Sequence, residues 1–291
     1  MQRYNVGAPF ERIALDVLGP LPRTTGGNKY ILVVMDYFSK WPEAYAIPDQ
    51  EATTVSEELV QNWVSRFGVP LLMHSDQGRN FTSAVFHGMC KLLGIEKTRT
   101  TPLHPQSDGM VERFNRTILN HLSLFVSQNQ QDWDQKLQLF LLAYRSAVQE
   151  STGFTPSLML FGRELRLPCD LLFGRPPDTP SSVEDYVDNL RERLEDVHAI
   201  ARERIRISSE KMKTRYDVKA TKREFQEGDR VWFWNPKRRK GLSPKLQTSW
   251  EGPYKVIKKL SDVVIRIQKS PSSKPKVVHY DRLAPYYGDR A

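Results

Sequence analysis

Cysteine is nearly absent from this chain, which has only two among its 291 residues. Cys90 and Cys169 can form neither a disulfide framework nor a four-thiol zinc site, and so few thiols suit a reducing, intracellular compartment. No apolar run reaches the roughly 18 residues that a membrane span needs. The N-terminus also lacks the pattern of a secretory signal peptide. The sequence therefore excludes a disulfide-rich secreted class and predicts no membrane partner.

Charge is unevenly distributed along the chain. Residues 1–198 carry 19 Lys and Arg against 24 Asp and Glu, a net charge of −5. Residues 199–291 carry 24 against 10, a net charge of +14. A basic C-terminal part joined to a mildly acidic part suggests a polyanion partner that binds mainly to the C-terminal part. A solvated basic surface without such a partner is the alternative.

The first half of the chain alternates between strand and helix patterns. Tyr30–Asp36 is a nearly continuous apolar run, as expected of a strand that is covered on both faces. The turn residues 25–28 join it to the preceding strand as a hairpin. Five strands are predicted, over residues 10–18, 30–36, 41–47, 71–75 and 95–98. Four helices are predicted, over residues 51–67, 83–93, about 108–125 (capped by Ser107 or Asp108) and 133–148.

Three carboxylates stand out in this pattern. Asp16 lies in the first predicted strand, and Asp76 directly follows the fourth. Glu112 lies in the first turns of the third helix, one position off its apolar stripe, and 35 residues separate it from Asp76. Asp76 is set in Ser-Asp-Gln-Gly-Arg-Asn-Phe, and Glu112 in His-Pro-Gln-Ser-Asp-Gly-Met-Val-Glu-Arg-Phe-Asn. The three acids alone are a weak signal; with the interval and both flanks, the signal is strong.

These residues resemble the catalytic core of retroviral and gypsy-type retrotransposon integrases. Asp108 stands where retroviral members often have Gln and gypsy-type members commonly have Asp, which favours the gypsy type. The resemblance implies an α/β, ribonuclease H-like integrase catalytic core over residues 1–162, in which Asp16 and Asp76 lie at the ends of neighbouring strands.

The resemblance also implies the chemistry of the site. Three converging carboxylates repel one another unless a cation joins them. Oxygen-only ligation favours Mg²⁺, with Mn²⁺ as a plausible substitute. In the family, Asp16 would bridge two ions, while Asp76 and Glu112 would each complete one. Two ions can activate an attacking oxygen and stabilise a leaving one at phosphorus.

Each candidate also has an ordinary structural explanation. A lone Asp at a strand end is usually a turn or cap residue, and a lone Glu in a first turn serves the helix dipole. The combined motif favours metal ligation for Asp16, Asp76 and Glu112, whereas Asp36 and Asp108 are interpreted as structural. The lesser candidates are polar residues that could contact DNA or orient the ligands: Asn80, Gln106, Asn115 and Arg116.

The remainder of the chain contains three segments. Residues 163–182, with four prolines, are predicted to be a linker, and residues 183–221 a long amphipathic helix. This helix could be a coiled-coil or spacer helix, or it could pack on its own core. Residues 222–291 show short strand patterns and resemble the SH3-like, DNA-binding module of gypsy-type integrases. In that module Trp232, Trp234, Trp250 and Tyr254 are interpreted mainly as core, and Lys237, Arg238, Arg239 and Lys240 as phosphate contacts.

The six His and two Cys show no spacing for the N-terminal zinc domain with which full-length integrases begin. The chain is thus expected to be part of a polyprotein or a truncated genomic copy. The predicted function is that of a retroelement integrase in the nucleus, which trims element DNA ends and transfers them into target DNA. Double-stranded DNA and further copies of the chain are the expected partners. The alternatives are a non-catalytic DNA-binding host protein derived from a retroelement, and a nuclease or transposase of the same fold.

Overall fold

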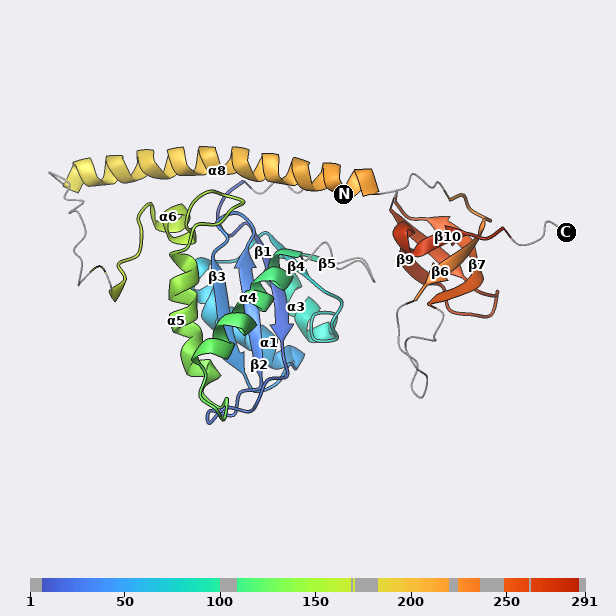
Figure 1. Ribbon diagram of the computed structural model, residues 1–291, viewed down its shortest axis with the longest axis horizontal. Coiled ribbons are helices and arrows are strands. Elements are labelled where there is room, and N and C mark those ends of the chain that lie inside the picture. The colour runs from blue at the N-terminus through green and yellow to red at the C-terminus, as the bar shows by residue number, and fades with distance from the viewer. Residues whose placement is uncertain are drawn as a thin grey trace. The chain divides into compact units, whose positions relative to one another are not determined.

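The computed structural model describes residues 7–99, 109–168, 170, 183–219, 225–235, 249–261 and 263–287 (Figure 1). The chain divides into two compact units. Of the residues that the structure describes, those up to Thr214 belong to the first unit and those from Arg215 onward to the second. The first unit therefore extends beyond residue 162, because it includes most of the long helix.

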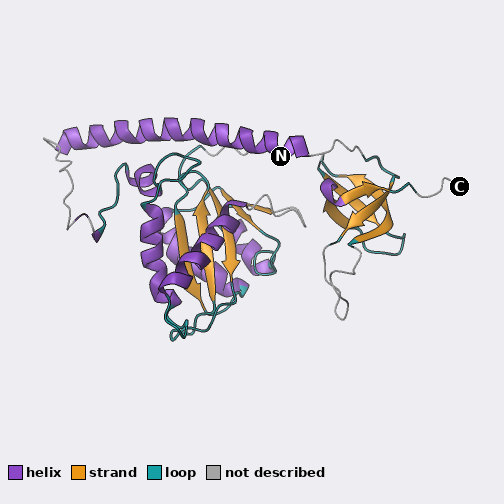
Figure 2. Ribbon diagram, in the orientation of Figure 1, coloured by secondary structure: helices purple, strands orange, loops and turns teal. Residues whose placement is uncertain are grey.

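The first unit is built on a five-stranded sheet of order β3-β2-β1-β4-β5 (Figure 2). The strands β1, β2 and β3 form an antiparallel meander, and β4 and β5 run parallel to β1. Six of the seven residues of β2 are buried, as predicted for a strand covered on both faces. The predicted fold class is confirmed. The strands are β1 (Arg12–Leu18), β2 (Tyr30–Asp36), β3 (Pro42–Ile47), β4 (Leu72–Ser75) and β5 (Glu96–Arg99).

Helices cover both faces of this sheet. One face buries Ile13 and Leu15 against the helical stretch α1–η1–α2 and helix α3. The other face buries Ala14 against α4 and α5. The helices are α1 (Ala52–Glu58), the π-helical segment η1 (Leu59–Val64), α2 (Ser65–Phe67), α3 (Ala84–Leu92), α4 (Gly109–Phe125), α5 (Trp133–Arg145) and α6 (Pro156–Phe161).

The π-helical segment explains a spacing in the sequence. Val55, Leu59 and Trp63 are all fully buried, at intervals of four residues. In a regular α-helix of 3.6 residues per turn, such a row turns by about 40° at each step. A π turn closes with i→i+5 bonds and holds more residues per turn, so it keeps this row on one side.

The long helix α8 (Val183–Lys219) packs against the first unit. Val197 and Ala201 are buried in a cluster with Phe38 and Met159. The His198 ring hydrogen-bonds the Met159 carbonyl oxygen (Nε2 to O, 2.7 Å). Of the two alternatives for this helix, the structure therefore shows packing on its own core.

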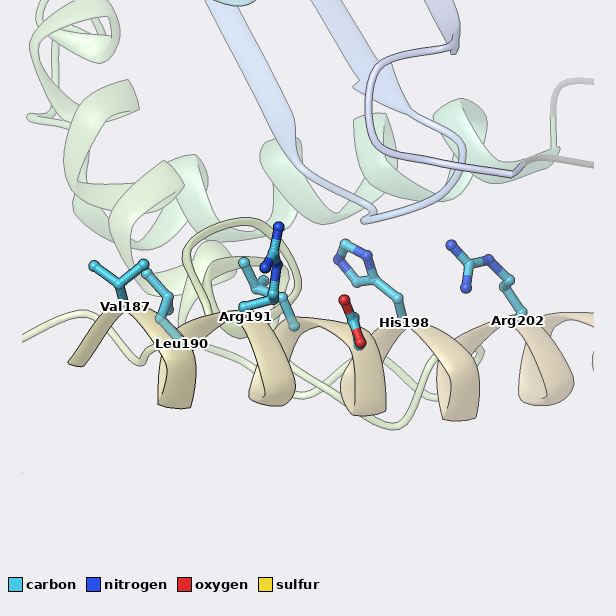
Figure 3. A pocket seen from close by; sticks show the side chains of 7 residues that line it. Val187, Leu190, Arg191, His198 and Arg202 are labelled. Atoms are coloured by element: carbon cyan, nitrogen blue, oxygen red, sulfur yellow. The ribbon is translucent and has the colours of Figure 1, made fainter. Parts of the chain in front are cut away.

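A pocket of about 410 Å³ lies along α8. Figure 3 shows its labelled side chains rising from one side of the helix, among them Leu190, Arg191 and His198. Gly162, which ends α6 with φ 65°, lets the chain pass close to the helix. A Cβ there would come within 2.5 Å of Leu190 Cδ1 and would also meet the left-handed strain that glycine avoids. None of the described helices is both long and apolar enough to cross a membrane.

The second unit is an all-β module, as predicted. Its five strands form one antiparallel sheet of order β10-β6-β7-β8-β9, around a core that includes Val231, Phe233 and Ile267. The strands are β6 (Arg230–Trp234), β7 (Trp250–Lys259), β8 (Val264–Gln268), β9 (Lys276–His279) and β10 (Leu283–Pro285).

The tryptophans of this module correct one prediction. Tyr254 is buried, as expected, but Trp250 is 45% exposed. Trp232 and Trp234 are half-buried, and Trp234 lies under the Arg282 guanidinium at 4.3 Å. The cause is the two-residue period of a strand. Val231 and Phe233 take the core-facing positions of β6, so Trp232 and Trp234 fall on the outer face. Trp250 is the register partner of Trp234.

Candidate active site

The first two predicted carboxylates belong to adjacent parallel strands: Asp16 lies on β1, and Asp76 directly follows β4. The register pairs Leu15 of β1 with Ser75 of β4, so Asp16 and Asp76 are the next residue on each chain segment. Both line a pocket of about 290 Å³. Asp16 still lies within β1, because that strand continues to Leu18 along its antiparallel neighbour. The sheet therefore brings together two carboxylates that are 60 residues apart in sequence.

Asp16 is held by hydrogen bonds on both carboxylate oxygens. The Val17 backbone N–H donates to Oδ1 at 2.8 Å, and Asn115 Nδ2 donates to Oδ2 at 2.7 Å. Burial raises the pKa of the Asp16 carboxyl above its usual range, and the charges of Asp76 and Glu112 raise it further. The hydrogen bonds from Val17 and Asn115 lower the same pKa and so oppose that effect. The Asp16 carboxylate is thus held in one orientation, and its ionised form is disfavoured by burial and by the two neighbouring carboxylates.

Asp76 is exposed and is positioned by the loop that follows it. Its Oδ1 accepts a hydrogen bond from the Gly78 N–H at 2.9 Å. A Cβ at Gly78 would lie 2.4 Å from Asn80 Oδ1 and 3.0 Å from Asp76 Oδ1, so a larger residue would displace the Asn80 side chain. The buried Phe81 anchors the loop against Phe86, with ring centroids 5.5 Å apart. Asn80, a predicted candidate, therefore lines the same pocket as the two carboxylates.

Glu112 lies in the first turn of α4, as predicted, and is exposed. Its neighbours Val111 and Phe114 are buried against the sheet, which turns Glu112 away from the core. Its charge reaches Asp16, since it raises the pKa of that residue. Within the described residues, however, no three His, Cys, Asp or Glu side chains are close enough to hold one metal ion. The role of Glu112 as a third ligand stays a prediction.

Asn115 is three residues after Glu112 and is buried. Its amide nitrogen binds Asp16, so in this structure it orients a carboxylate. Its Oδ1 is also buried and has no hydrogen-bond partner among the described residues. Arg116 is exposed on the same helix. Of the other candidates, Gln106, Asp108 and Lys237, Arg238, Arg239 and Lys240 lie outside the described residues.

Two polar side chains that line the pocket, those of Gln50 and Arg79, were not among the sequence candidates. Gln50 lies in the connection between β3 and α1, and no pattern in the sequence points to it. Arg79 lies inside the motif around Asp76, and this position is a signal by which the sequence could identify it as a site residue.

Asp36, interpreted as structural, is fully buried and accepts hydrogen bonds from the backbone N–H and hydroxyl of Ser39 at 2.7 and 2.6 Å.

His74 supports the strand that presents Asp76. It is buried, and its Nδ1 lies 2.8 Å from the Thr98 hydroxyl on β5. Burial, together with the positive charges of Arg12 and Lys97, lowers the pKa of His74 to about 4. The ring is therefore neutral near pH 7 and belongs to the packing beneath the site.

Comparison with known families gives two matches. A model described as an integrase core domain matches residues 7–105. A model described as Integrase p58, C-terminal domain, matches residues 252–285. The first match contains Asp16 and Asp76 and ends before Glu112, and the second falls in the all-β unit.

Two similar relatives are Pol polyproteins. The Retrovirus-related Pol polyprotein from transposon 412 of Drosophila melanogaster is 28% identical over 280 residues, which cover 96% of this chain and 22% of the polyprotein. The Pol polyprotein of Radiation murine leukemia virus (strain Kaplan) is 32% identical over 238 residues, which cover 79% of this chain and 38% of the polyprotein. The chain thus spans well under half the length of either relative.

One solved structure shares the fold over most of the chain. It is a chain of the simian T-cell lymphotropic virus intasome in complex with PP2A regulatory subunit B56 gamma, with a TM-score of 0.59 and 16% sequence identity. The match covers 99% of this chain and 83% of that one. At this identity the likeness concerns the fold alone.

Proposed function

Since the chain belongs to the integrase family of retroviruses and retrotransposons, we propose that it catalyses metal-dependent phosphoryl transfer on DNA. The reactions are the trimming of element DNA 3′ ends by water and the attack of those ends on target DNA. The proposed compartment of the reaction is the nucleus, where the target DNA would be chromosomal. The observation that carries this proposal is the pair Asp16 and Asp76, which adjacent parallel strands bring into one pocket.

The side chains around this pocket suit a hard divalent cation. The donors that line it include the carboxylate oxygens of Asp16 and Asp76, which are the hard ligands that such cations prefer. Burial and two neighbouring carboxylates disfavour the charge on Asp16, and a cation would remove that penalty. Asp16 and Asp76 would hold Mg²⁺ or Mn²⁺, with Glu112 completing a second ion. When bound, such ions activate an attacking oxygen and stabilise a leaving oxygen at phosphorus.

The residues themselves supply position and access. Asn115 and the Val17 N–H fix the rotamer of Asp16, and the Gly78 N–H fixes Asp76. Asp76 is exposed, so a DNA phosphate can reach the pocket from solvent. Because the two carboxylates already have fixed positions, no free energy is spent on reorienting them when the reacting phosphate arrives. This lowers the free energy of the transition state.

The all-β unit is proposed to bind the DNA backbone. The registers pair Arg230 with Lys255 and Lys258 with Arg266, so these four cations share the outer face of β6, β7 and β8. Arg230, Lys255 and Lys258 are exposed. Cations spread over an open sheet face suit a polyanion whose phosphates repeat along its length.

Strand transfer with a labelled DNA end tests the catalytic proposal. The full chain should join the end to a target duplex with Mg²⁺, and EDTA should abolish joining. Asp16→Asn and Asp76→Asn should each lower the rate on the order of a thousandfold or more, because each removes a charged ligand. Asp188→Asn makes the same chemical change at an exposed position of α8 and should leave the rate unchanged.

Three results would contradict the proposal. Joining that persists in EDTA would exclude the metal reaction. DNA binding without any joining under all metal conditions would favour a non-catalytic DNA-binding protein. Cleavage that never produces a joined product would favour a nuclease of the same fold.

A further inference from the structure

The outer face of the all-β unit carries aromatic rings as well as cations. Trp232 and Trp234 lie on the outward-facing side of β6. Trp250 on β7 is the register partner of Trp234 and is 45% exposed. Tyr286, which follows β10, lies against Trp232, with ring centroids 5.3 Å apart. We name Trp232, Trp234, Trp250 and Tyr286 the aromatic face. Single exposed apolar residues are common, but four rings on one side of one sheet indicate a binding surface.

Two rings of the aromatic face are held in place by their surroundings. A Cβ at Gly252 would lie 3.0 Å from Trp232 Cε3, so this glycine lets the Trp232 ring lie close to the backbone of β7. The Arg282 guanidinium covers Trp234, at 4.3 Å from its ring centroid. Trp250 is the most exposed of the four rings. Because the neighbouring rings are already ordered, little conformational entropy is lost when a flat ligand stacks on this surface.

The charges around the aromatic face indicate an anionic ligand. Arg230 and Lys255 are exposed and are register partners on the same outer face. The described residues between 225 and 287 carry nine Lys and Arg against four Asp and Glu. A cationic ligand, such as a methylated ammonium group, is disfavoured because Arg282 already covers the Trp234 ring and the surrounding charge is positive. The surface therefore suits a ligand that combines flat rings with negative charge.

Unpaired nucleotides have both properties. In a DNA duplex the bases stack on one another and show only their edges in the grooves, so their flat faces are not available. In a single strand each base can stack on an aromatic side chain while its phosphate contacts a nearby cation. A proline-rich peptide also binds to exposed aromatic rows, but it has no phosphate for Arg230 and Lys255 to contact. Rings and cations together therefore favour single-stranded DNA over a peptide.

We propose that the aromatic face binds unpaired nucleotides of DNA by base stacking, with Trp250 as the main stacking ring. The source of these nucleotides rests on the proposed function: trimming the 3′ end of one strand leaves the 5′ end of the complementary strand unpaired. The contact adds recognition of a single-stranded end to the backbone binding proposed for the same unit. Through it, the chain distinguishes a trimmed element end from a blunt duplex.

Fluorescence anisotropy of labelled DNA with the full chain tests the proposal. Binding is measured in EDTA, so that no metal-dependent reaction occurs. The probes are a blunt duplex, the same duplex with a short 5′ extension, and the same extension built from abasic nucleotides. The abasic extension keeps the phosphates and removes the bases, so it isolates stacking from charge. The wild-type chain should bind the base-bearing extension about tenfold or more tightly than the abasic one.

Variants assign the base preference to the aromatic face. Trp250→Ala should lose most of the difference between the two extensions and keep its affinity for the abasic one, whereas Trp250→Phe, which retains a ring, should keep part of the difference. Tyr186→Ala removes an aromatic side chain of similar exposure (43%) from α8 and should leave the difference unchanged. Arg230→Gln combined with Lys255→Gln should weaken the binding of all three probes alike, because phosphates are common to them.

The comparison of the two extensions on the wild-type chain does not depend on how any variant folds. Equal affinity for the base-bearing and abasic extensions overturns the proposal, and so does a base preference that Trp250→Ala retains. Binding of an oligoproline peptide that Trp250→Ala abolishes, without any base preference, would assign the aromatic face to a peptide. A chain that prefers the base-bearing extension but never joins DNA ends would overturn the proposed catalysis alone.

Discussion

The two compact units use charge in opposite ways. In the first unit, Asp16 is half-buried, held by hydrogen bonds on both oxygens, and destabilised by two other carboxylates. In the second unit, Arg230, Lys255 and Lys258 stand exposed on an open sheet face. A group that must hold a reacting atom in place benefits from a fixed, desolvated position. A cation that attracts a polyanion is better placed at the solvent-exposed surface, where its side chain can contact any of several phosphates.

This difference predicts how each unit responds to change. Substitutions around Asp16 and Asp76 should alter the rate of catalysis with little dependence on salt. Substitutions on the outer face of the all-β unit should alter DNA affinity and its salt dependence, and should leave the chemistry unchanged once DNA is bound.

The largest effect is expected for Glu112→Gln. Gln keeps the shape and helix propensity of Glu, and the buried neighbours Val111 and Phe114 are untouched, so the fold should persist. The loss of one charged ligand should cost several kcal/mol of transition-state stabilisation, on the order of a thousandfold in strand-transfer rate. Glu57→Gln, at an exposed position of α1, is the matched control. A Glu112 variant that stays active but melts earlier would show a helix-terminal charge only.

A smaller effect is expected for Asn115→Ala, which removes the amide that holds Asp16. Residues that orient metal ligands typically contribute about 10–100-fold to activity or metal affinity. The distinguishing readout is a higher Mg²⁺ concentration for half-maximal rate, with partial recovery when Mg²⁺ is raised. Asn120→Ala, at an exposed position of the same helix, should leave the Mg²⁺ dependence as in the wild type. An Asn115 variant with normal Mg²⁺ dependence and reduced stability would indicate a packing role alone.

His74 predicts a pH-dependent stability in the first unit. Its folded-state pKa is lowered to about 4, mainly by burial. Between about pH 6.5 and pH 4, the His74 side chain is therefore protonated in the unfolded chain and neutral in the folded chain. The free energy of unfolding should therefore fall as pH drops from about 6.5 toward 4, by on the order of 2 kcal/mol between pH 7.5 and pH 5. Chemical unfolding of His74→Gln at the two pH values should show a smaller difference than the wild type. His87→Gln, at an exposed position of α3, should keep the wild-type difference.

The smallest effect is expected on the outer face of the all-β unit. Arg230→Gln combined with Lys255→Gln removes two proposed phosphate contacts. The slope of log affinity against log salt should become shallower by about two units, with a loss of roughly tenfold or less at moderate salt. Lys91→Gln, exposed on α3 of the first unit, is the control and should leave the slope unchanged. An unchanged slope in the double variant, with a shallower one in the control, would move the DNA-binding surface to the first unit.

Much of the architecture follows from local patterns in the sequence. The apolar run Tyr30–Asp36 predicts a strand with the bounds that the structure shows, because a strand buried on both faces needs apolar residues at every position. The helix predicted over residues 83–93 is found at Ala84–Leu92. Its start is marked by Ser83, whose side chain accepts a hydrogen bond from the Phe86 N–H. The resemblance to integrases implies that Asp16 and Asp76 lie at the ends of neighbouring strands, and the register of β1 and β4 shows that these strands are adjacent.

Other features depend on contacts between distant segments. Trp250 has a large apolar side chain of the kind usually found in a core, but its pairing with Trp234 places it on the outer face of the sheet. The apolar spacing of α8 is compatible with a spacer helix, and only Phe38 and Met159 show that the core covers one of its sides. No local pattern carries this information, because it depends on which segments meet after the chain has folded.

The candidate site divides in the same way. The residue types, their flanks and the 35-residue interval between Asp76 and Glu112 can be read from the sequence, because they depend only on the order of residues along the chain. The packing of distant segments brings the Asn115 amide to the Asp16 carboxylate, 99 residues away in sequence, and brings Gln50 into the lining of the same pocket. A hydrogen bond requires two atoms within about 3 Å in a narrow range of angles. Spacing along the chain cannot specify that geometry, because it is set by the packing of α4 on the sheet.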